Sequence, residues 1–177
     1  HLYDLKCAVI SKNVAAIGRK AFYKCCSLVN VIIPESVRFI GEMAFCGCES
    51  LRFAVIPEGV EAVLPFTFYN CDSLERADLP ESIRVIGESA FGFCSSMKEI
   101  NLNENIVSIG DAAFQNCISL NKLEIPSAMT EIAENAFTFC SGLEVVAIPL
   151  GIEAIGNNAF FGCSSLKKVD IAGSVRK

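Results

Sequence analysis

Residues 28–50 read LVNVIIPESVRFIGEMAFCGCES, and this pattern recurs along the whole sequence. Phenylalanine recurs at steps of 23 residues on either side of Phe45, and cysteine recurs at the same step on either side of Cys48. A fixed period of this length predicts a solenoid, in which each unit buries its apolar residues against its neighbours. We therefore expect residues 1–177 to form a single repeat domain. Its units are 5–27, 28–50, 51–73, 74–96, 97–119, 120–142 and 143–165, with a partial unit at 166–177.

The first part of each unit predicts a strand. Constant apolar positions such as Val31 and Ile33 alternate with a variable one, which is typical of a strand with one buried face. Proline follows, as at Pro34, and turns the chain out of the sheet because it cannot donate to the ladder. At a spacing of ~4.8 Å, eight parallel strands make a stack about 34 Å long. We expect these strands near residues 5–10, 28–33, 51–56, 74–79, 97–102, 120–125, 143–148 and 166–171.

The second part of the unit leaves more than one structure open. Val37 and Ile40 suit a second, shorter extended piece, but periodicity alone does not separate a strand from a helical turn there. Gly41 is interpreted as supplying a backbone angle that other residues avoid, and the A-F-x-x-C after it is long enough for about one helical turn. Leu64 and Ala133 replace this glycine in two units, which affects the expected turn geometry there but not the fold.

The repeat resembles the 23-residue, Treponema-type leucine-rich repeat of BspA-like proteins over essentially the entire chain. In the unit 28–50 the matching positions are Leu28, Val31, Ile33, Pro34, Val37, Ile40, Gly41, Ala44, Phe45 and Cys48. The resemblance implies a right-handed, curved coil with a parallel inner sheet, and short turns or one-turn helices on the outer side. It also implies adhesion or protein binding, usually at the cell surface or after secretion, and it brings no catalytic motif.

Composition excludes several function classes. The formal net charge of −5 argues against a general nucleic-acid binder, whose footprint is a basic stripe. No apolar run approaches the ~18 residues that indicate a membrane span. The chain begins and ends inside repeat units without polar capping repeats, so we interpret it as a fragment whose open ends could self-associate.

The 10 cysteines suggest packed free thiols, disulfides or a zinc site. Seven of them form one column, in which neighbouring Cβ vectors are parallel, whereas a disulfide requires Cβ atoms ~3.8 Å apart and turned toward each other. His1 is the only histidine and no C-x-x-C pair exists, which disfavours both zinc and a histidine-activated nucleophile. We expect free thiols, no metal, no other cofactor and no enzyme activity. Among Cys7, Cys26 and Cys46, which lie off the column, only Cys46 is expected to be exposed.

Two further columns each have two interpretations. Glutamates at the strand exits either attract calcium or a basic partner, or occupy solvated turn positions, and we favour the solvated turn. Aromatic residues of the turns either pack against the next turn or face a ligand, and we favour packing. These columns are Glu35, Glu58, Glu81 and Glu104, and Tyr23, Tyr69, Phe93, Phe139 and Phe161.

The variable strand positions should carry the individual function of the chain, because they point off the inner face. An apolar cluster near the N-terminus consists of Val9, Val29, Ile32, Phe53 and Val55, and a mixed-charge middle consists of Glu75, Arg76, Asp78, Lys98, Glu99, Asn101, Lys122 and Glu124. An apolar patch with a polar rim commonly marks a partner site. Missing upstream sequence or a second copy of the chain would cover the same patch.

The leading hypothesis is therefore a non-enzymatic module that binds a protein, or a polysaccharide, through this face. An intracellular scaffold for protein assembly is the alternative. The resemblance favours the cell surface or secretion, free cysteines suit the cell interior, and the sequence leaves the localisation open.

Overall fold

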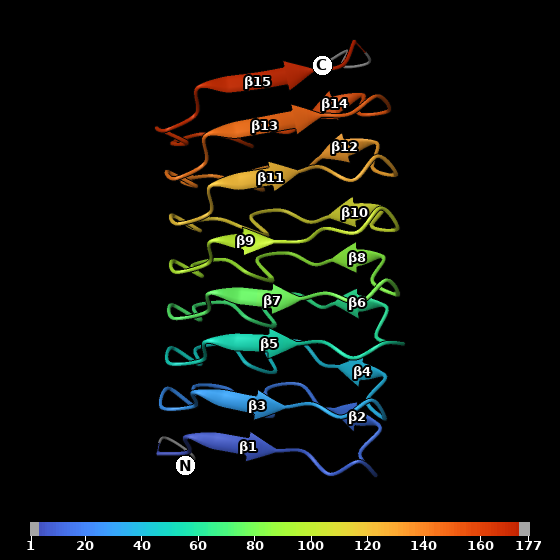
Figure 1. Cartoon of the computed structure of the whole chain (residues 1–177), viewed down its shortest axis with the longest axis vertical. Helices are drawn as coiled ribbons and strands as arrows, with labels where there is room; N and C mark the ends of the chain where they lie inside the picture. The colour runs from blue at the N-terminus through green and yellow to red at the C-terminus, as the bar shows by residue number, and fades with distance from the viewer. Residues whose placement is uncertain (1–3, 174–177) are drawn as a thin grey trace.

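The computed structural model describes residues 4–173 and consists of stacked coils, one for each repeat unit (Figure 1). The odd-numbered strands lie in one column and are parallel, with Val9 beside Ile32 one unit later. We call this column the main sheet. It confirms the eight predicted strands, although each is shorter than predicted. They are β1 (Cys7–Val9), β3 (Asn30–Ile32), β5 (Phe53–Val55), β7 (Arg76–Asp78), β9 (Glu99–Ile100), β11 (Lys122–Glu124), β13 (Val145–Ile148) and β15 (Lys168–Ile171).

The even-numbered strands form a second column, which we call the short sheet (Figure 1). Each has two residues, so the extended interpretation of the second apolar pair is correct, although Val37 itself precedes the strand and is buried. They are β2 (Ala16–Ile17), β4 (Phe39–Ile40), β6 (Ala62–Val63), β8 (Val85–Ile86), β10 (Ser108–Ile109), β12 (Glu131–Ile132) and β14 (Ala154–Ile155). No helix in residues 4–173 is long and apolar enough to cross a membrane.

The constant phenylalanines form a continuous stack inside the coils. Successive ring centroids are 5.1 to 5.5 Å apart, and the rings are tilted by 3° to 12°. The five central rings are fully buried, as expected. Phe22 and Phe160 are only partly buried, because each stacks on a single neighbouring ring.

The third side of each coil is made of turns, and the helical-turn alternative is wrong for the described residues. Backbone N–H groups alternate between two kinds of acceptor. The Phe45 N–H donates to Thr67 O in the next coil (2.9 Å), whereas the Cys46 N–H donates to Met43 O in its own coil (3.2 Å). A helical turn would direct both inside the coil. The bonds that join successive coils here form what we call the turn ladder.

Two residues of each turn have left-handed backbone conformation. In the unit 28–50 they are Met43 (φ 56°) and Gly47 (φ 74°), and the equivalent positions of every unit from 5–27 to 143–165 also have positive φ. They include non-glycine residues such as Phe66 and Ala112. Because the left-handed region costs such residues about 1–2 kcal/mol, contacts between coils must offset this strain.

The recurrent glycine of the short sheet has a different role from the predicted one. Gly41 and Gly110 are not among the residues with positive φ. A Cβ built on Gly41 would lie 2.5 Å from the Arg19 backbone nitrogen, and one on Gly110 would lie 2.8 Å from that of Glu88. The position therefore requires glycine because neighbouring backbones approach closely, not because of a backbone angle.

The two units that lack this glycine coincide with breaks in the short sheet. Within the described residues, β2 pairs with β4, β6 with β8 and β10, and β12 with β14, but β4 does not pair with β6 nor β10 with β12. Leu64 follows β6 and Ala133 follows β12, so each places a Cβ against the preceding coil. Within the described residues, the main sheet is interrupted at the same two steps, between β3 and β5 and between β9 and β11, so the loss of the glycine coincides with lost strand pairing in both sheets.

Candidate binding face

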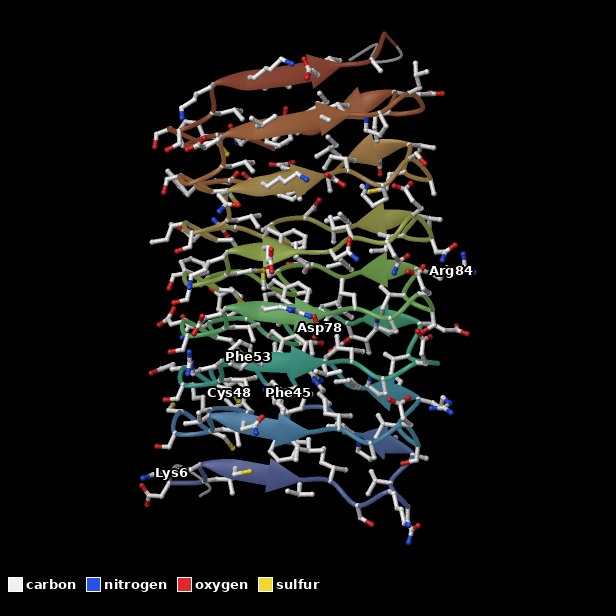
Figure 2. All side chains as sticks on the ribbon, in the orientation of Figure 1. Lys6, Phe45, Cys48, Phe53, Asp78 and Arg84 are labelled. Carbon is white, nitrogen blue, oxygen red and sulfur yellow. The ribbon has the colours of Figure 1, made fainter. Side chains whose placement is uncertain are left out.

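The apolar cluster lies on the outward side of the main sheet. We keep the name apolar patch for Val9, Val29, Ile32, Phe53 and Val55, all of which are exposed. Side chains alternate as predicted, since Ala54 between Phe53 and Val55 is buried. Figure 2 shows Phe53 over β5. The next coil changes from apolar to charged, because Phe53 lies beside Arg76 and Val55 beside Asp78.

Beyond the patch, the outward positions of three coils carry polar side chains. We call Arg76, Asp78, Glu99, Asn101, Lys122 and Glu124 the charged centre. The two cations are each paired along their own strand, Arg76 with Asp78 and Lys122 with Glu124. These carboxylates raise the pKa of Arg76 and of Lys122 through hydrogen bonds and charge. The Glu99 side chain makes no hydrogen bond or ion pair with any described residue, although its charge also contributes to raising the pKa of Arg76.

The charged centre surrounds an open depression of about 390 Å³, which residues from β7, β9 and β11 line. A second hollow of about 560 Å³ continues along β11 and β13, where Val145 and Ala147 join Lys122 and Glu124. The surface dips where β9 has only two residues and does not pair with β11. The structure thus brings the sequence-predicted residues together on one face, as an apolar patch followed by a charged hollow.

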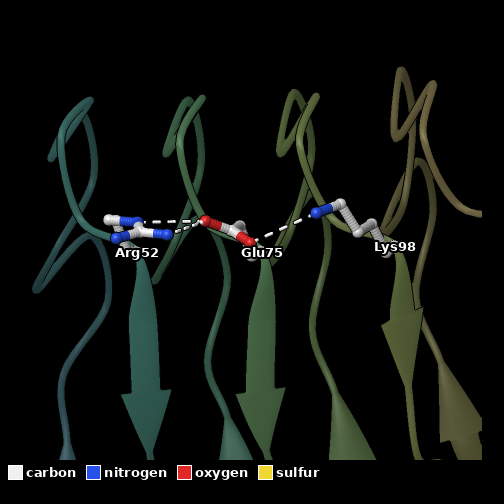
Figure 3. A network of polar contacts seen from close by, with 3 residues as sticks. All are labelled: Arg52, Glu75 and Lys98. Carbon is white, nitrogen blue, oxygen red and sulfur yellow. Dashed lines mark hydrogen bonds and ion pairs between the residues drawn. The ribbon is translucent and has the colours of Figure 1, made fainter.

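A row of charges lies at the start of the strands and joins successive coils (Figure 3). Arg52 Nη2 is 2.6 Å from Glu75 Oε1, and Lys98 Nζ is 3.3 Å from Glu75 Oε2. These bonds, first from Arg52 and then from Lys98, lower the pKa of Glu75. Arg52 also lies 5.2 Å from the Phe53 ring centroid, which links the row to the patch. Sequence reasoning missed Arg52, although opposite charges 23 residues apart were an available signal.

The column cysteines act as hydrogen-bond donors. The Cys48 Sγ donates to Phe22 O at 3.2 Å, and each later column cysteine donates to the phenylalanine of the preceding coil. Figure 2 labels Cys48 beside Phe45. Burial raises the pKa of Cys48 to about 12, so the thiol keeps the proton that it donates. This bonding supports the packing interpretation of the column.

Of the three cysteines off the column, the prediction was wrong for Cys7 and Cys46, whereas Cys26 is not exposed, as expected. Cys7 is the exposed cysteine, whereas Cys46 is partly buried. Cys7 belongs to the outward row of the main sheet, since it pairs with Asn30. Cys46 lies in the turn near Lys20 and Lys24, and its pKa is raised by burial, which these cations partly oppose.

The glutamate column bonds to neighbouring coils. Glu58 Oε1 accepts the Glu81 N–H (3.2 Å), and Glu104 Oε2 accepts the Ser127 N–H (2.8 Å) and hydroxyl (2.6 Å). The Ser127 bonds lower the pKa of Glu104. No group of His, Cys, Asp or Glu within residues 4–173 could hold a metal ion. Glutamates of this column therefore occupy exposed turn positions and also form hydrogen bonds to the turns of the next coil.

The turn aromatics divide into two groups. Tyr69 and Phe93 are partly buried and meet edge to face at 5.4 Å, as the packing interpretation expects. Tyr23, Phe139 and Phe161 are exposed, so for them the packing interpretation holds only in part. Phe139 and Phe161 contact each other edge-on at 5.3 Å instead of joining a stack, so much of each ring stays open.

The comparisons with known proteins agree with the repeat pattern. The profile of the BspA type leucine rich repeat region matches residues 3–92 and 63–177. A leucine-rich repeat protein from Bacteroides ovatus is 31% identical, with a TM-score of 0.93 over 96% of this chain and 46% of that protein. The leucine-rich repeat protein of T. pallidum is 30% identical, with a TM-score of 0.85 over 92% of this chain and 78% of that protein. No curated protein matches the sequence. The chain thus spans less than half of its Bacteroides ovatus relative.

Proposed function

We propose that this chain, which belongs to the BspA-type leucine-rich-repeat family, is a module that binds a protein partner through its main sheet. One observation carries the proposal, namely that exposed apolar side chains lie next to one another on successive coils. Val9, Ile32 and Val55 are 72%, 52% and 56% exposed, and the charged hollow lies next to them. An apolar patch with a polar rim is the usual composition of a partner site.

Phe53 is the anchor of the proposed interface. Its ring is 47% exposed, and the Arg52 guanidinium lies over it. Aromatic and arginine side chains account for a large share of measured binding energy, and one such anchor can contribute ~2 kcal/mol or more. The charged centre would then form the rim, which mainly governs association rate and salt dependence.

Binding to cell surfaces tests this proposal, because the family resemblance suggests adhesion. We would add fluorescently labelled protein to cultured epithelial cells and compare wild type with Phe53→Ala and Ile32→Asp. The matched control is Phe39→Ala, since Phe39 is 50% exposed but lies in β4 of the short sheet. We expect both main-sheet variants to weaken binding about thirtyfold or more, which corresponds to ~2 kcal/mol, and the control to bind as wild type does.

Enzyme treatment of the cells separates two kinds of target. Binding that is lost after protease treatment but survives glycosidases supports a protein partner, and the reverse result means a polysaccharide. Equal loss in Phe39→Ala and Phe53→Ala, or no loss in either main-sheet variant, would place binding elsewhere and contradict the proposal. Sedimentation of wild type and Phe53→Ala tests the remaining possibility, since a dimer lost on mutation means that a second copy covers the patch.

A scaffold inside the cell is the second candidate, and the cysteine column favours it. The buried thiols serve the structure as protonated donors, so the fold does not require an oxidising compartment. Both candidates use the same face. Fractionation of cells that express the full-length parent protein distinguishes them, because a surface module is found outside and a scaffold inside.

A further inference from the structure

We infer that the partner inserts a cationic side chain, lysine or arginine, into the charged centre opposite Glu99, with an apolar side chain beside it on the patch. This inference rests on the proposed binding function and names the chemistry of its partner.

The charged centre has one carboxylate more than it has cations. Asp78, Glu99 and Glu124 are the carboxylates, and Arg76 and Lys122 are the cations. The centre therefore has an excess of one negative charge. In the structure Glu99 is the carboxylate without a bonded cation, because Arg76 is bonded to Asp78 and Lys122 to Glu124, and Glu99 acts on Arg76 only through its charge.

The position of Glu99 makes it the point that a partner must satisfy. Glu99 lies on β9, in register with Arg76 on β7, and it lines the depression together with Asn101. Its coil is flanked by the two coils whose cations are already engaged along their own strands. An incoming group therefore meets an exposed carboxylate at the middle of a hollow, with paired charges on both sides.

Desolvation determines which partner fits. A docked protein removes water from the hollow, and a carboxylate that loses water without gaining a partner is costly. A cation that donates to Glu99 offsets this cost through a charge-assisted hydrogen bond. An acidic or wholly apolar segment leaves Glu99 unpaired and is disfavoured, so the same group that attracts one partner class rejects another.

The spacing of the face fixes the pattern of the partner segment. Phe53, Arg76 and Glu99 occupy one outward column on successive coils. Two strand spacings separate Phe53 from Glu99, which is about 10 Å. A polyproline II segment that runs along the stack rises ~3.1 Å per residue and returns to the same face every three residues, so it covers this distance in about three residues with both side chains facing the sheet. The expected segment therefore carries an aromatic or aliphatic side chain about three residues from a lysine or arginine.

Selection from a phage-displayed library of short random peptides tests this pattern without knowledge of the natural partner. The immobilised protein is the whole chain, and each enriched peptide is synthesised and titrated against three variants. Glu99→Gln keeps the shape and removes the charge, while Phe53→Ala removes the apolar anchor. Glu131→Gln is the matched control, because Glu131 is an exposed strand carboxylate on the short sheet.

We expect the enriched peptides to share a cation about three residues from an apolar side chain. Their affinity should fall about tenfold in Glu99→Gln, the size expected for a charge-assisted hydrogen bond, and should be unchanged in Glu131→Gln. Added salt should weaken binding to wild type more than to Glu99→Gln.

Two other results have separate meanings. Peptides that need Phe53 but lack a cation and ignore Glu99→Gln would overturn this inference and leave the proposed binding face standing. Peptides that ignore both Phe53→Ala and Glu99→Gln, or no enrichment at all, would count against the inference and against the proposed function together.

Discussion

The turn side and the short sheet hold successive coils together in different ways. The turn side contains no strand, yet its ladder continues through every step between the seven full coils. The constant phenylalanine N–H donates to the next coil at 2.7 to 2.9 Å each time, from Phe22 to Phe137. The short sheet consists of strands, yet its pairing is interrupted twice.

The difference follows from which side chains are constant. Every full coil supplies the turn side with a phenylalanine and a cysteine, so each step has a stacked ring, and each step from Cys48 onward also has a bonded thiol. The short sheet depends on a glycine that two units have lost. Cohesion between coils therefore follows the constant buried side chains more closely than it follows the strands.

Removal of a central ring should have the largest effect. Phe91 is fully buried between Phe68 and Phe114, at 5.4 Å from each ring. We expect Phe91→Ala to lower the free energy of unfolding by ~3–5 kcal/mol, through lost transfer energy and the cavity left behind. Urea denaturation measures this against Phe39→Ala, an exposed ring of the short sheet, for which we expect less than about 1 kcal/mol. Similar losses in both variants would show that the two sides do not differ.

Alkaline pH should lower the free energy of unfolding through the buried thiols of the cysteine column. Burial raises the pKa of Cys117 from about 9 to about 12, so the folded chain keeps a proton that the unfolded chain loses. The free energy of unfolding should therefore be insensitive to this group below about pH 9 and then fall by about 1.4 kcal/mol per pH unit until about pH 12.

Cys117→Ser isolates this effect, since the hydroxyl remains protonated throughout the window. Denaturation midpoints at increasing pH should decline less steeply in Cys117→Ser than in wild type. Cys7→Ser is the control, because Cys7 is exposed, and its curve should parallel that of wild type. Identical slopes in all three proteins would mean that the column thiols are not held as buried donors.

A methyl group on the close-approach glycine should reproduce a natural break in the short sheet. Gly110→Ala would bring its Cβ to 2.8 Å from the Glu88 backbone nitrogen, and we expect a loss of about 1–3 kcal/mol. In the wild type, the Gly110 amide donates a hydrogen bond to Ile86 O. The amide at this position should exchange its hydrogen faster in the variant. Gly18→Ala is the matched control, since no atom lies within 4 Å of its added Cβ. Equal tolerance of both changes would reject close approach as the cause of the breaks.

The smallest expected effect is a gain in stability. Ala112 has φ 53°, and glycine at this position should stabilise the chain by about 0.5–1 kcal/mol, because relief of left-handed strain exceeds the added chain entropy. Thermal denaturation can detect this gain. The neighbouring Ala113 is fully buried and is not among the residues with positive φ, so Ala113→Gly should be destabilising. Destabilisation by Ala112→Gly would mean that the turn ladder depends on side chains at this position.

The sequence predicted the parts of the fold that depend on buried side-chain types. Alternation around Val31 located the strands, and the step from Phe45 to Phe68 located the stack. The turn ladder was not predictable in this way. Left-handed conformation occurs at residues as different as Phe66 and Ala112, because hydrogen bonds to the next coil impose it and the side chain does not.

The same division applies to the candidate binding face. The constant step of 23 residues is sufficient to predict that Ile32, Phe53 and Glu99 share one surface. It gives no information on how cations choose among nearby carboxylates, since that depends on side-chain conformations within and between coils. The lone carboxylate of Glu99 and the bridge from Arg52 to Glu75 are therefore features that only the three-dimensional arrangement reveals.

Because the register of the main sheet is constant, the length of its face can change only by whole repeat units. An in-frame duplication or loss of one repeat unit lengthens or shortens the face by about 4.8 Å and leaves every other column aligned. Groups such as Phe53 and Glu99 can then move apart or together in fixed increments, without redesign of either coil. Recombination between neighbouring repeats in the gene thus supplies a stepwise route to new spacings between surface groups that single amino-acid substitutions do not.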